Sequence, residues 1–463
     1  MSVDFTLRKF FHPLAVAKLR RAFERSQWFT PEQFHHYQEQ KLRKLIEHAY
    51  ATVPYYRDLF RHLHLYANDL RCLKALQNLP VLSKAALRKH FRSLQSTFAD
   101  SYGAHLIRTS GTSGEPVTFL LDTPSNVLEF VYYWRHWSWA GYKIGLRFAE
   151  FASNYFLQNS RYGQEHYLFQ RLTGRLLLNS MSISEESVRE YVQAIRYHRP
   201  LFLKGLASVL HIFAHFVRTL NYDLEFRAIF STGEMLLPWQ RRDIEQTFRC
   251  KVYDSYGHME RTVAVSECPA GGFHINPEYG VMELLPLAET EAASLNTGRN
   301  SRIKLASVVG TSLHNLSMPL IRYETGDVAE VMADDTPCPC GRHMPRIQRI
   351  IGRQQDAIIT VDGRVITTLF IVFDKVPGIL CGQIIQCEPA RLLIRIARTK
   401  EYNNRSEMEL LNYARQFVGP AMSIDINYVD KHSSFYYPGC KHRAVISCLA
   451  HDTRTAAVPA MSF

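Results

Sequence analysis

A run of small hydroxyl residues and glycines at 108–116, Arg-Thr-Ser-Gly-Thr-Ser-Gly-Glu-Pro, could bind phosphate. Glycine lets the backbone approach a ligand closely, so backbone N–H groups and hydroxyls can surround phosphate oxygens. No lysine follows the glycines, which excludes the Gly-x4-Gly-Lys-Ser/Thr phosphate loop. Such a run by itself is more often an ordinary turn, so its meaning depends on the segments that accompany it.

Four further segments place a charged side chain beside a glycine or an aromatic ring, three of them at expected strands and the fourth at the start of the expected second domain. They are 231–234 (Ser-Thr-Gly-Glu), 256–260 (Tyr-Gly-His-Met-Glu), 322–327 (Arg-Tyr-Glu-Thr-Gly-Asp) and 352–356 (Gly-Arg-Gln-Gln-Asp). Farther along, Lys441 stands after a Pro-Gly turn in the stretch 437–443. The order of these segments along the chain shifts the interpretation of 108–116 from a turn towards a binding loop.

The elements between these motifs predict an α/β layered fold. Apolar residues follow helical spacing at 42–49 and 188–195, and we expect 201–220 to be one core-facing helix rather than a membrane span. Buried strands are expected at 226–230 and 251–253, so strands alternate with helices.

The pattern restarts after about residue 352, which predicts a second domain. A strand at 392–396, a helix capped by Ser406 and a strand at 424–428 form a β-α-β unit. We therefore expect a large domain of layered sheets and helices at 1–352 and a small α+β domain at 353–463.

The composition is that of a globular protein. Of 463 residues, 46% are hydrophobic and 21% are charged, so the chain can bury a sizeable core. No 18-residue apolar run free of charge and no secretory signal are evident, so we expect no integral membrane segment. The formal net charge of +12 indicates either a solvated basic surface or a nucleotide-sized anionic partner. Without a run of five basic residues, we expect no nucleic acid partner.

Four residues in Gly/Pro-rich loops could bind zinc. Cys268 and His274 flank Pro-Ala-Gly-Gly, and Cys338 and Cys340 follow about 65 residues later. Three thiolates and one imidazole complete a tetrahedral Zn²⁺ shell, which would make the site structural. The alternative is a set of buried reduced cysteines. The odd count of nine cysteines indicates reduced thiols and a cytoplasmic location.

In this order and spacing the segments resemble the adenylate-forming superfamily of acyl- and aryl-CoA ligases. They are similar in particular to its phenylacetate–CoA ligase-like group, which includes CapK-type capsule-biosynthesis proteins. The stretches 45–56 and 200–210, and the Cys/His arrangement, also look like that group, so the resemblance spans about residues 40–447. It implies a ligase that uses ATP and Mg²⁺ to convert a carboxylic acid to its adenylate, releasing pyrophosphate. The acyl group then passes to a thiol, usually of CoA.

The resemblance also implies roles for individual residues. The β- and γ-phosphates would be held by Thr109, Ser110, Gly111, Thr112, Ser113 and Gly114. The adenine pocket would be formed by Gly233, Glu234, Asp254, Ser255 and Tyr256. Glu260 would bind Mg²⁺, and Asp327 would accept hydrogen bonds from the ribose hydroxyls. Arg353 would reach the ribose or the phosphates, and Lys441, in the small domain, would contact the reacting oxygens during adenylation.

Three positions depart from the pattern of the group. Glu115 stands where many relatives carry lysine, which removes a positive charge near the phosphates. Met259 replaces a common threonine and so removes a hydroxyl. Gln355 stands where relatives often carry an acidic hinge residue, so the domain rotation between half-reactions could be tuned differently.

The substrate and the acceptor stay open. Aromatic residues crowd 131–154, which would suit an aryl acid, although ordinary core packing is the interpretation we favour. The acceptor could be CoA, a carrier-protein thiol, an amine or a hydroxyl. A non-enzymatic alternative is a zinc-stabilised scaffold that has lost catalysis, but the presence of Glu260, Asp327 and Lys441 argues against it. A homodimer is compatible with the sequence.

Overall fold

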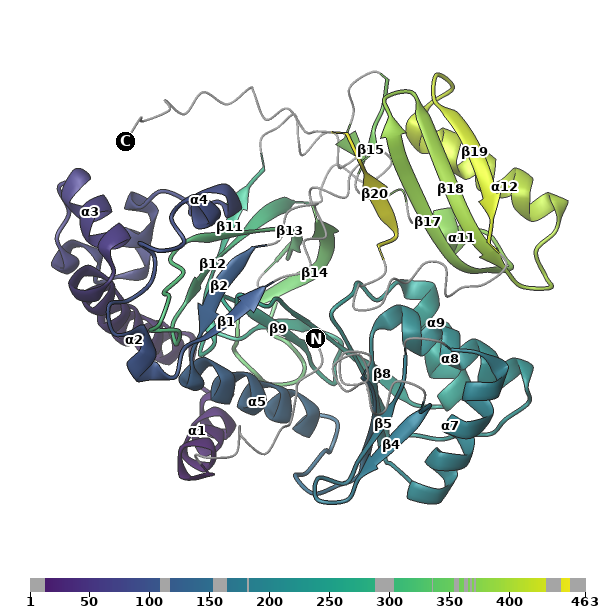
Figure 1. Cartoon of the computed structure of the whole chain (residues 1–463), viewed down its shortest axis with the longest axis horizontal. Coiled ribbons are helices and arrows are strands. Elements are labelled where there is room, and N and C mark those ends of the chain that lie inside the picture. Colours follow the sequence, from purple (N-terminus) through teal and green to yellow (C-terminus); the bar gives the residue numbers. More distant parts are fainter. Residues whose placement is uncertain are drawn as a thin grey trace. The chain divides into compact units, whose positions relative to one another are not determined.

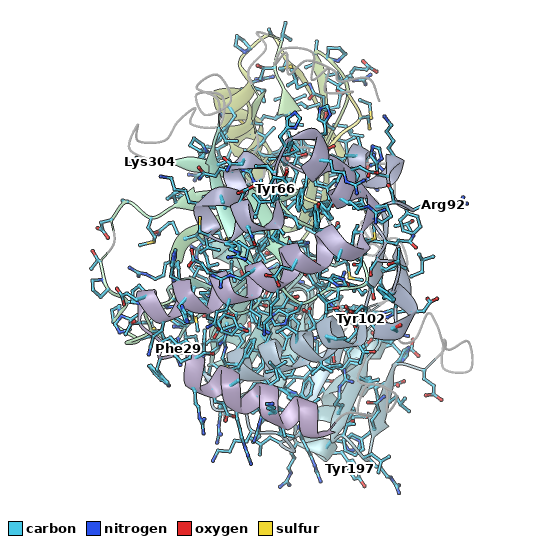
Figure 2. All side chains as sticks on the ribbon, turned by 90° about the vertical axis from the view of Figure 1, so that its left-hand side faces the viewer. Phe29, Tyr66, Arg92, Tyr102, Tyr197 and Lys304 are labelled. Atoms are coloured by element: carbon cyan, nitrogen blue, oxygen red, sulfur yellow. The ribbon has the colours of Figure 1, made fainter. Side chains whose placement is uncertain are left out.

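A computed structural model describes residues 13–108, 117–152, 165–180, 183–287, 304–334, 336–353, 358–361, 365–366, 369, 372–429 and 443–449 (Figure 1). The chain divides into two compact units, and the described residues from Ile358 onwards belong to the second. Side chains fill the interior of the fold, whereas Tyr66 and Tyr197 are 70% and 81% exposed (Figure 2). Strands alternate with helices in both units, as expected of the predicted α/β class.

The first unit opens with helices α1 (Pro13–Ser26), α2 (Pro31–Thr52), α3 (Pro54–His62) and α4 (Lys84–Lys89). Short 3₁₀ turns lie at Ala67–Leu70, Leu73–Asn78 and Ala99–Tyr102. The Thr30 hydroxyl accepts from the backbone N–H of Gln33, whose side chain accepts from the backbone N–H of Thr30, so this pair fixes the start of α2. Proline fits the first turn of a helix but not its interior, so Pro54 ends α2 and begins α3. The predicted apolar face of α2 is buried at Leu42, Leu45, Ile46 and Ala49.

A sheet of twelve strands forms the centre of the first unit, in the order β11-β12-β13-β14-β10-β9-β8-β7-β6-β3-β5-β4. Its strands are β3 (Phe148–Phe151), β4 (Tyr167–Gln170), β5 (Arg175–Leu178), β6 (Phe202–Gly205), β7 (Ala228–Thr232), β8 (Lys251–Gly257), β9 (Ala264–Glu267), β10 (Phe273–Ile275), β11 (Gly280–Pro286), β12 (Leu305–Ser312), β13 (Tyr323–Val331) and β14 (Arg346–Arg353). A separate antiparallel pair consists of β1 (His105–Arg108) and β2 (Thr118–Leu121).

The large sheet has a parallel part and an antiparallel part. Strands β5, β3, β6, β7 and β8 pair in parallel, whereas β9 and β10 are antiparallel to their neighbours. At the other end, β11, β12 and β13 also pair antiparallel. The two ends of the sheet are joined where β10 pairs with β14, in register through Phe273↔Ile347 and His274↔Arg346.

Helices cover both faces of the parallel part (Figure 1). On one face lie α7 (Glu185–His198), α8 (Ala207–Thr219) and α9 (Pro238–Phe248), and on the other lies α5 (Thr123–Ser138). Strand β3 shows the division, because alternate side chains of a strand point to opposite faces. The ring of Phe151 packs against Tyr191 and Phe213 of α7 and α8. The ring of Phe148 packs against Trp137 of α5.

Three sequence-based boundaries in this unit were wrong. The strand expected at 226–230 is β7, which occupies Ala228–Thr232. The segment 201–220 is not one helix, because β6 occupies Phe202–Gly205 and α8 begins at Ala207. A short apolar run is too brief to show either helical or strand periodicity. A buried strand that directly precedes a helix can therefore be mistaken for the first turn of that helix. Strand β8 continues to Gly257, beyond the predicted end at 253. Among the described residues, no helix combines the length and apolar character needed to cross a membrane.

The second unit contains a four-stranded sheet in the order β19-β18-β17-β20. Its elements are β15 (Ile358–Ile359), β16 (Val365–Ile366), α11 (Val372–Lys375), β17 (Ile379–Glu388), β18 (Arg391–Arg398), α12 (Asn404–Val418), β19 (Ser423–Tyr428) and β20 (Val445–Ser447). The predicted β-α-β order at 392–428 is confirmed, but Ser406 is not the cap of the helix. Asn403 caps α12 by accepting from the backbone N–H of Arg405 and Ser406, and the Ser406 hydroxyl accepts from Asn403 in return.

Candidate active site and metal centre

Both carboxylate oxygens of Glu260, in the loop after β8, have hydrogen-bond partners. Nδ1 of His258 lies 3.0 Å from Oε2, and the Tyr323 hydroxyl of β13 donates to Oε1 at 2.8 Å. Burial acts to raise the pKa of Glu260, but the hydrogen bond and charge of His258, with the bond from Tyr323, outweigh it and lower the pKa to about 2. Glu260 is therefore ionised near neutral pH, as an oxygen ligand for a hard cation must be.

Asp327 of β13 is held by Tyr256 of β8. The Tyr256 hydroxyl donates to Oδ2 of Asp327 at 2.6 Å. The preceding Gly326 has φ +78°, and a Cβ at this position would lie 2.8 Å from Nζ of Lys84. Glycine is therefore favoured here by the backbone conformation, whereas the flexible end of Lys84 could move aside for a side chain. The structure thus brings the segments 256–260 and 322–327 together.

The loop that carries Glu260 passes in close contact with strands β11 and β12 of the sheet. Nε2 of His258 lies 3.0 Å from the hydroxyl of Thr262, so the imidazole ring is fixed on both sides. A Cβ at Gly310 of β12 would collide with the Thr262 side chain, and a Cβ at Gly280 of β11 would collide with the Thr262 carbonyl. These two strand glycines make room for the loop, and so for the position of His258 beside Glu260.

Glu234 binds the N-terminus of α8. The backbone N–H of Ser208 donates to Oε2 of Glu234 at 3.1 Å, and the Ser208 hydroxyl donates to the same oxygen. A carboxylate at this position is stabilised by the unpaired N–H groups and the dipole of the helix. Gly233, with φ +82°, makes the turn that directs Glu234 there. Glu234 therefore has a structural partner within the protein.

Asp254 and Ser255 lie on β8 beside a buried acid of β9. The backbone N–H of Asp254 donates to Glu267 at 2.8 Å, and Arg241 donates to the same oxygen at 2.8 Å. The Ser255 hydroxyl donates to the carbonyl of Ser231 at 3.1 Å, which links β8 to β7. Burial, followed by the charge of Glu267, raises the pKa of Asp254 to about 7. Its carboxyl group therefore titrates near neutral pH.

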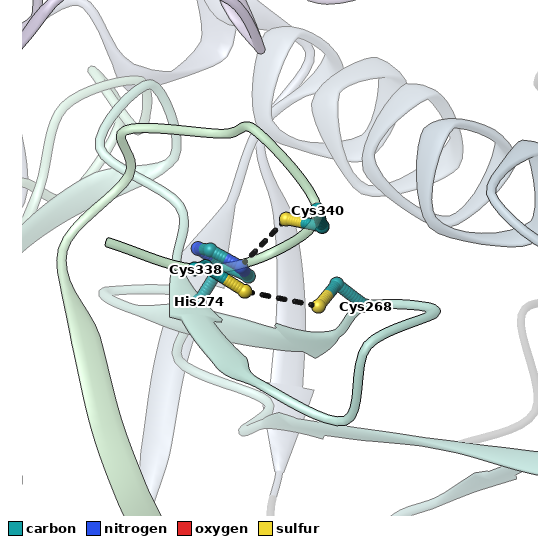
Figure 3. A group of neighbouring side chains, drawn as sticks. All are labelled: Cys268, His274, Cys338 and Cys340. Atoms are coloured by element: carbon teal, nitrogen blue, oxygen red, sulfur yellow. Dashed lines mark hydrogen bonds between the residues drawn. The ribbon is translucent and has the colours of Figure 1, made fainter. Parts of the chain in front are cut away.

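Cys268, His274, Cys338 and Cys340 converge on one point (Figure 3). Their ligand atoms all lie within 4.8 Å of one another. The sulfurs of Cys268 and Cys338 are 3.6 Å apart, and Cys340 Sγ lies 3.3 Å from Nε2 of His274. Ligand pairs containing sulfur lie about 3.5–3.8 Å apart in a tetrahedral zinc site. Nδ1 of His274 lies 3.2 Å from the Met344 carbonyl, which leaves Nε2 as the ligand nitrogen. The four side chains therefore fit Zn²⁺.

The surroundings of this centre act differently on its thiols: burial raises the pKa of Cys268 to about 12. A Cβ at Gly272 would lie 3.0 Å from the sulfur of Cys338, so a side chain at this position would crowd the ligands. Burial acts to raise the pKa of Cys340, but hydrogen bonds from the backbone and side chain of Arg342 lower it. The guanidinium of Arg342 also stacks on Trp139, 4.2 Å from the ring centroid. Arg342 thus places a positive charge beside a ligand set that is rich in thiolate.

Several predicted residues cannot be placed. The phosphate-loop residues Thr109–Gly114 and the lysine Lys441 lie outside the described residues, as do Glu115 and Gln355. Arg353 ends β14, and its side chain also lies outside the description. Met259 packs against the apolar cluster around α2 and β2, so the side chain that replaces the family's threonine contributes to the core.

Most of the aromatic residues between 131 and 154 pack in the core, as favoured from the sequence. One cluster between α5 and the sheet contains Tyr132, Tyr133, Trp134, Trp137, Tyr142 and Phe148. A buried ion cluster at its edge was missed: Nζ of Lys204 donates to Glu150 at 2.9 Å, and Arg175 pairs with the same carboxylate. Nζ of Lys204 also lies 5.4 Å from the centroid of the Tyr133 ring. The sequence could not predict this cluster, because its acid and its two bases are far apart along the chain.

Sequence reasoning also assigned no role to the residues that hold the site together. Tyr323 and His258 lie within the two segments that contain the predicted acids. Their nearness in sequence to those acids could therefore have indicated their role. The proximity of Lys84 to Gly326 was also missed, because the two residues are more than 200 positions apart in the chain. Arg342 follows Cys340 by two residues, and a cation so close to a thiolate could have been expected.

The comparisons with known proteins found similarity to acyl-CoA ligases. Phenylacetate-coenzyme A ligase of Pseudomonas putida is 27% identical over 338 residues, covering 70% of this chain and 71% of that protein. The Thermus thermophilus protein of the same name is 25% identical over 347 residues, with the same coverage. A crystal structure of 2-hydroxyisobutyryl-CoA ligase with a bound acyl-adenylate covers 91% of each chain at 18% identity, with a TM-score of 0.68, and this likeness confirms the fold.

No model of a known protein family matches the chain. The similarity to the two ligases nevertheless covers more than two thirds of each of them, and the shared fold extends over nearly the whole chain. The chain is thus similar to phenylacetate-coenzyme A ligases over about 70% of its length, and it shares the fold of 2-hydroxyisobutyryl-CoA ligase.

Proposed function

We propose that the protein is an AMP-forming acid–CoA ligase. It activates a carboxylic acid with ATP as an acyl-adenylate and then transfers the acyl group to the thiol of CoA. The observation that carries the proposal is a reciprocal pair of hydrogen bonds. Tyr256 holds Asp327, and Tyr323 holds Glu260, so each of the two segments fixes the carboxylate of the other. The named relatives are ligases of this type, which supports the same reaction here.

The chemistry explains why these charges are needed. A carboxylate that attacks the α-phosphate of ATP meets like-charge repulsion, so cations and oriented donors must stabilise the transition state. Bound Mg²⁺ would supply part of that positive charge. The ionised, buried Glu260 would hold the ion, and the hydrogen bonds of His258 and Tyr323 fix the direction of its oxygens. Asp327 would accept hydrogen bonds from the ribose hydroxyls.

The remaining roles follow from the family pattern. The hydroxyls and backbone of 109–114 would hold the terminal phosphates, and Arg353 would contact the ribose or the phosphates. Gly233, Asp254 and Tyr256 would contribute to the adenine pocket, where Ser255 and Glu234 support the backbone. The small domain would present Lys441 to the reacting oxygens during adenylation, and a rotation would then remove it for thioester formation.

We also propose that Cys268, His274, Cys338 and Cys340 bind one structural Zn²⁺. The convergence of the four ligand atoms within 4.8 Å and the backbone partner of the His274 ring support this proposal. Four protein ligands close the coordination shell, so the metal would stabilise the fold and take no part in catalysis. Reduced thiols at this centre are compatible with the cytoplasmic location that the sequence suggests.

A panel of aliphatic, hydroxy and aryl carboxylic acids, assayed for pyrophosphate release with and without CoA, tests the proposal. We expect release that depends on one class of acid, together with a thioester product that forms only when CoA is present. Trapping by hydroxylamine without any thioester would point to a carrier-protein thiol, an amine or a hydroxyl as the acceptor. Absence of release with every acid, from protein that binds ATP, would contradict the enzyme assignment and favour a scaffold.

A further inference from the structure

We propose that Cys387 and Cys448, in the second unit, form a redox-active thiol pair that low-molecular-weight disulfides, such as oxidised glutathione, convert to an intramolecular disulfide. This modification site is separate from the metal centre, and its chemistry does not depend on the proposed ligase activity.

The two cysteines face each other at the ends of neighbouring strands. Strands β17 and β20 are parallel, with Gln386 opposite Ser447 in the register, so Cys387 and Cys448 are the next facing pair. The backbone N–H of Cys448 donates to the carbonyl of Gln386 at 2.7 Å, which extends the pairing to this position. Neighbouring strands lie about 4.8 Å apart, within the Cα separation of about 4.4–6.8 Å that a disulfide requires.

The sulfur atoms are already in contact. The Cys387 thiol donates to the sulfur of Cys448, and the two sulfurs lie 2.9 Å apart. Both side chains are exposed, so a small disulfide can reach them from solvent. No movement of the backbone is needed to bring the two sulfurs together.

The other described cysteines lack this combination of a partner and exposure. Cys268 and Cys338 are buried at the metal centre, where Cys340 is half-buried. Cys381 is buried in β17, and Cys250 is half-buried. Cys72 is exposed, but the structure places no described cysteine opposite it. Cys387 and Cys448 are therefore the pair that an external disulfide is expected to oxidise first.

The oxidation proceeds by two thiol–disulfide exchanges. The Cys448 thiolate attacks one sulfur of the reagent, which forms a mixed disulfide and releases the first small thiol. Cys387 then gives up its proton and attacks the Cys448 sulfur, which forms the intramolecular bond and releases the second small thiol. The protein loses two electrons and two protons, and the reagent disulfide is reduced to two thiols.

The disulfide would fasten the strand β20 to β17. The loop that it closes, 387–448, contains β18, α12 and β19, and β20 itself is three residues long. A crosslink of this kind restricts the unfolded chain and so stabilises the fold. We therefore expect the oxidised protein to unfold at a higher temperature than the reduced protein.

The test exposes the full-length, metal-containing protein to mixtures of reduced and oxidised glutathione, alkylates the remaining thiols and maps the peptides by mass spectrometry. We expect a peptide pair linked through Cys387 and Cys448 that dithiothreitol cleaves. The melting temperature should rise on oxidation of the wild type and of Cys72→Ser, but not of Cys387→Ser. In Cys387→Ser, a glutathione adduct should accumulate on Cys448, because the resolving thiol is missing.

Three results would overturn the proposal. One is the absence of the linked peptide under strongly oxidising conditions. Another is a stable glutathione adduct on Cys448 in the wild type, which would show that Cys387 does not resolve it. The third is an equal rise of the melting temperature in Cys387→Ser. None of these readouts depends on catalysis, so they stand whether or not the protein is a ligase.

Discussion

Tyr256 and Asp327 are 71 residues apart in the chain, yet the phenol donates a 2.6 Å hydrogen bond to the carboxylate. The reverse contact joins Tyr323 to Glu260 at 2.8 Å. Each segment therefore supplies one acid and one phenol, and neither acid is positioned by its own segment alone. The two acids should respond to mutation of residues that contact no substrate.

Replacing Tyr256 by phenylalanine removes the hydrogen bond to Asp327 but keeps the ring. A hydrogen bond to a charged group contributes about 1.5–3 kcal/mol, so we expect KM for ATP to rise by roughly ten- to a hundredfold. The measurement is initial-rate pyrophosphate release over a range of ATP concentrations. Tyr253→Phe, on the same strand, is the matched control and should behave as the wild type. An unchanged KM in Tyr256→Phe would mean that Asp327 is oriented without the phenol.

Glu260→Gln should abolish most of the Mg²⁺-dependent adenylation while the protein stays folded. Glutamine has the same shape as glutamate but lacks the charge that a metal ion requires. Losing one metal contact at developing phosphate charge costs on the order of 3 kcal/mol, or about a hundredfold in rate. Pyrophosphate release, with circular dichroism as the check on folding, measures this. Glu245→Gln, on α9, is the control, and wild-type activity in folded Glu260→Gln would refute the assignment.

The stability of the protein should also depend on Glu260 at acid pH. The folded-state pKa of about 2 lies below the ordinary value of 4.5, so the stabilisation is complete above pH 4.5 and is lost as the pH falls towards 2. The shift corresponds to about 3 kcal/mol at about 1.4 kcal/mol per pH unit. Urea unfolding at pH 7 and near pH 3 should therefore show a smaller acid loss in Glu260→Gln than in the wild type. Asp254, whose pKa is about 7, titrates in both proteins, so its contribution cancels. Equal losses would show that Glu260 is not held as an anion.

Protein prepared without chelators should contain about one Zn²⁺ per chain by elemental analysis. Cys338→Ser should lower the zinc content and the melting temperature, because a structural site contributes its binding free energy to folding. Cys72→Ser changes an exposed cysteine away from the centre and should alter neither quantity. A zinc-free wild type with normal stability would rule out the metal centre.

Lys441→Ala should impair one half-reaction. An ammonium group that neutralises the approach of the carboxylate to the phosphate stabilises the adenylation transition state, so adenylation should fall by roughly two or more orders of magnitude. Thioester formation from a preformed acyl-adenylate should change much less. Lys431→Ala is measured alongside, because Lys431 is the other lysine nearby in sequence and the alternative candidate for this role. Equal losses in both half-reactions would indicate damage to the fold, and no loss in adenylation would mean that the lysine is misassigned.

The sequence was informative where local chemistry determines the structure. The apolar face at Leu45 and Ile46 and the Pro54 boundary follow from rules that act within a few residues. The Cys/His set could be predicted because metal ligation restricts residue types and spacing. The start of α8 could not, because burial of Phe202 in the sheet depends on partners that are far away in sequence.

The contacts that orient the site were beyond sequence reasoning for the same reason. Tyr323 and Glu260 are brought together by the pairing of strands, and a single sequence does not state which strands are neighbours. The need for glycine at Gly310 is another example, because it arises from the loop that carries Thr262 across the sheet. Local rules predict helices and strands, whereas the packing of these elements against one another decides which side chains form a hydrogen bond.

The metal centre and the two acids of the candidate active site both depend on the pairing of β10 with β14. His274 is at once a member of the proposed metal site and one of the paired residues of that junction. Glu260 and Tyr256 belong to the β8 side of the sheet, and Asp327 and Tyr323 belong to the β13 side, so their hydrogen bonds span the same junction. If zinc and nucleotide both bind more tightly when β10 and β14 are paired, thermodynamic linkage requires each to tighten the binding of the other by the same factor. Zinc would then raise the affinity for nucleotide without contacting the nucleotide, because it raises the free energy needed to separate β10 from β14.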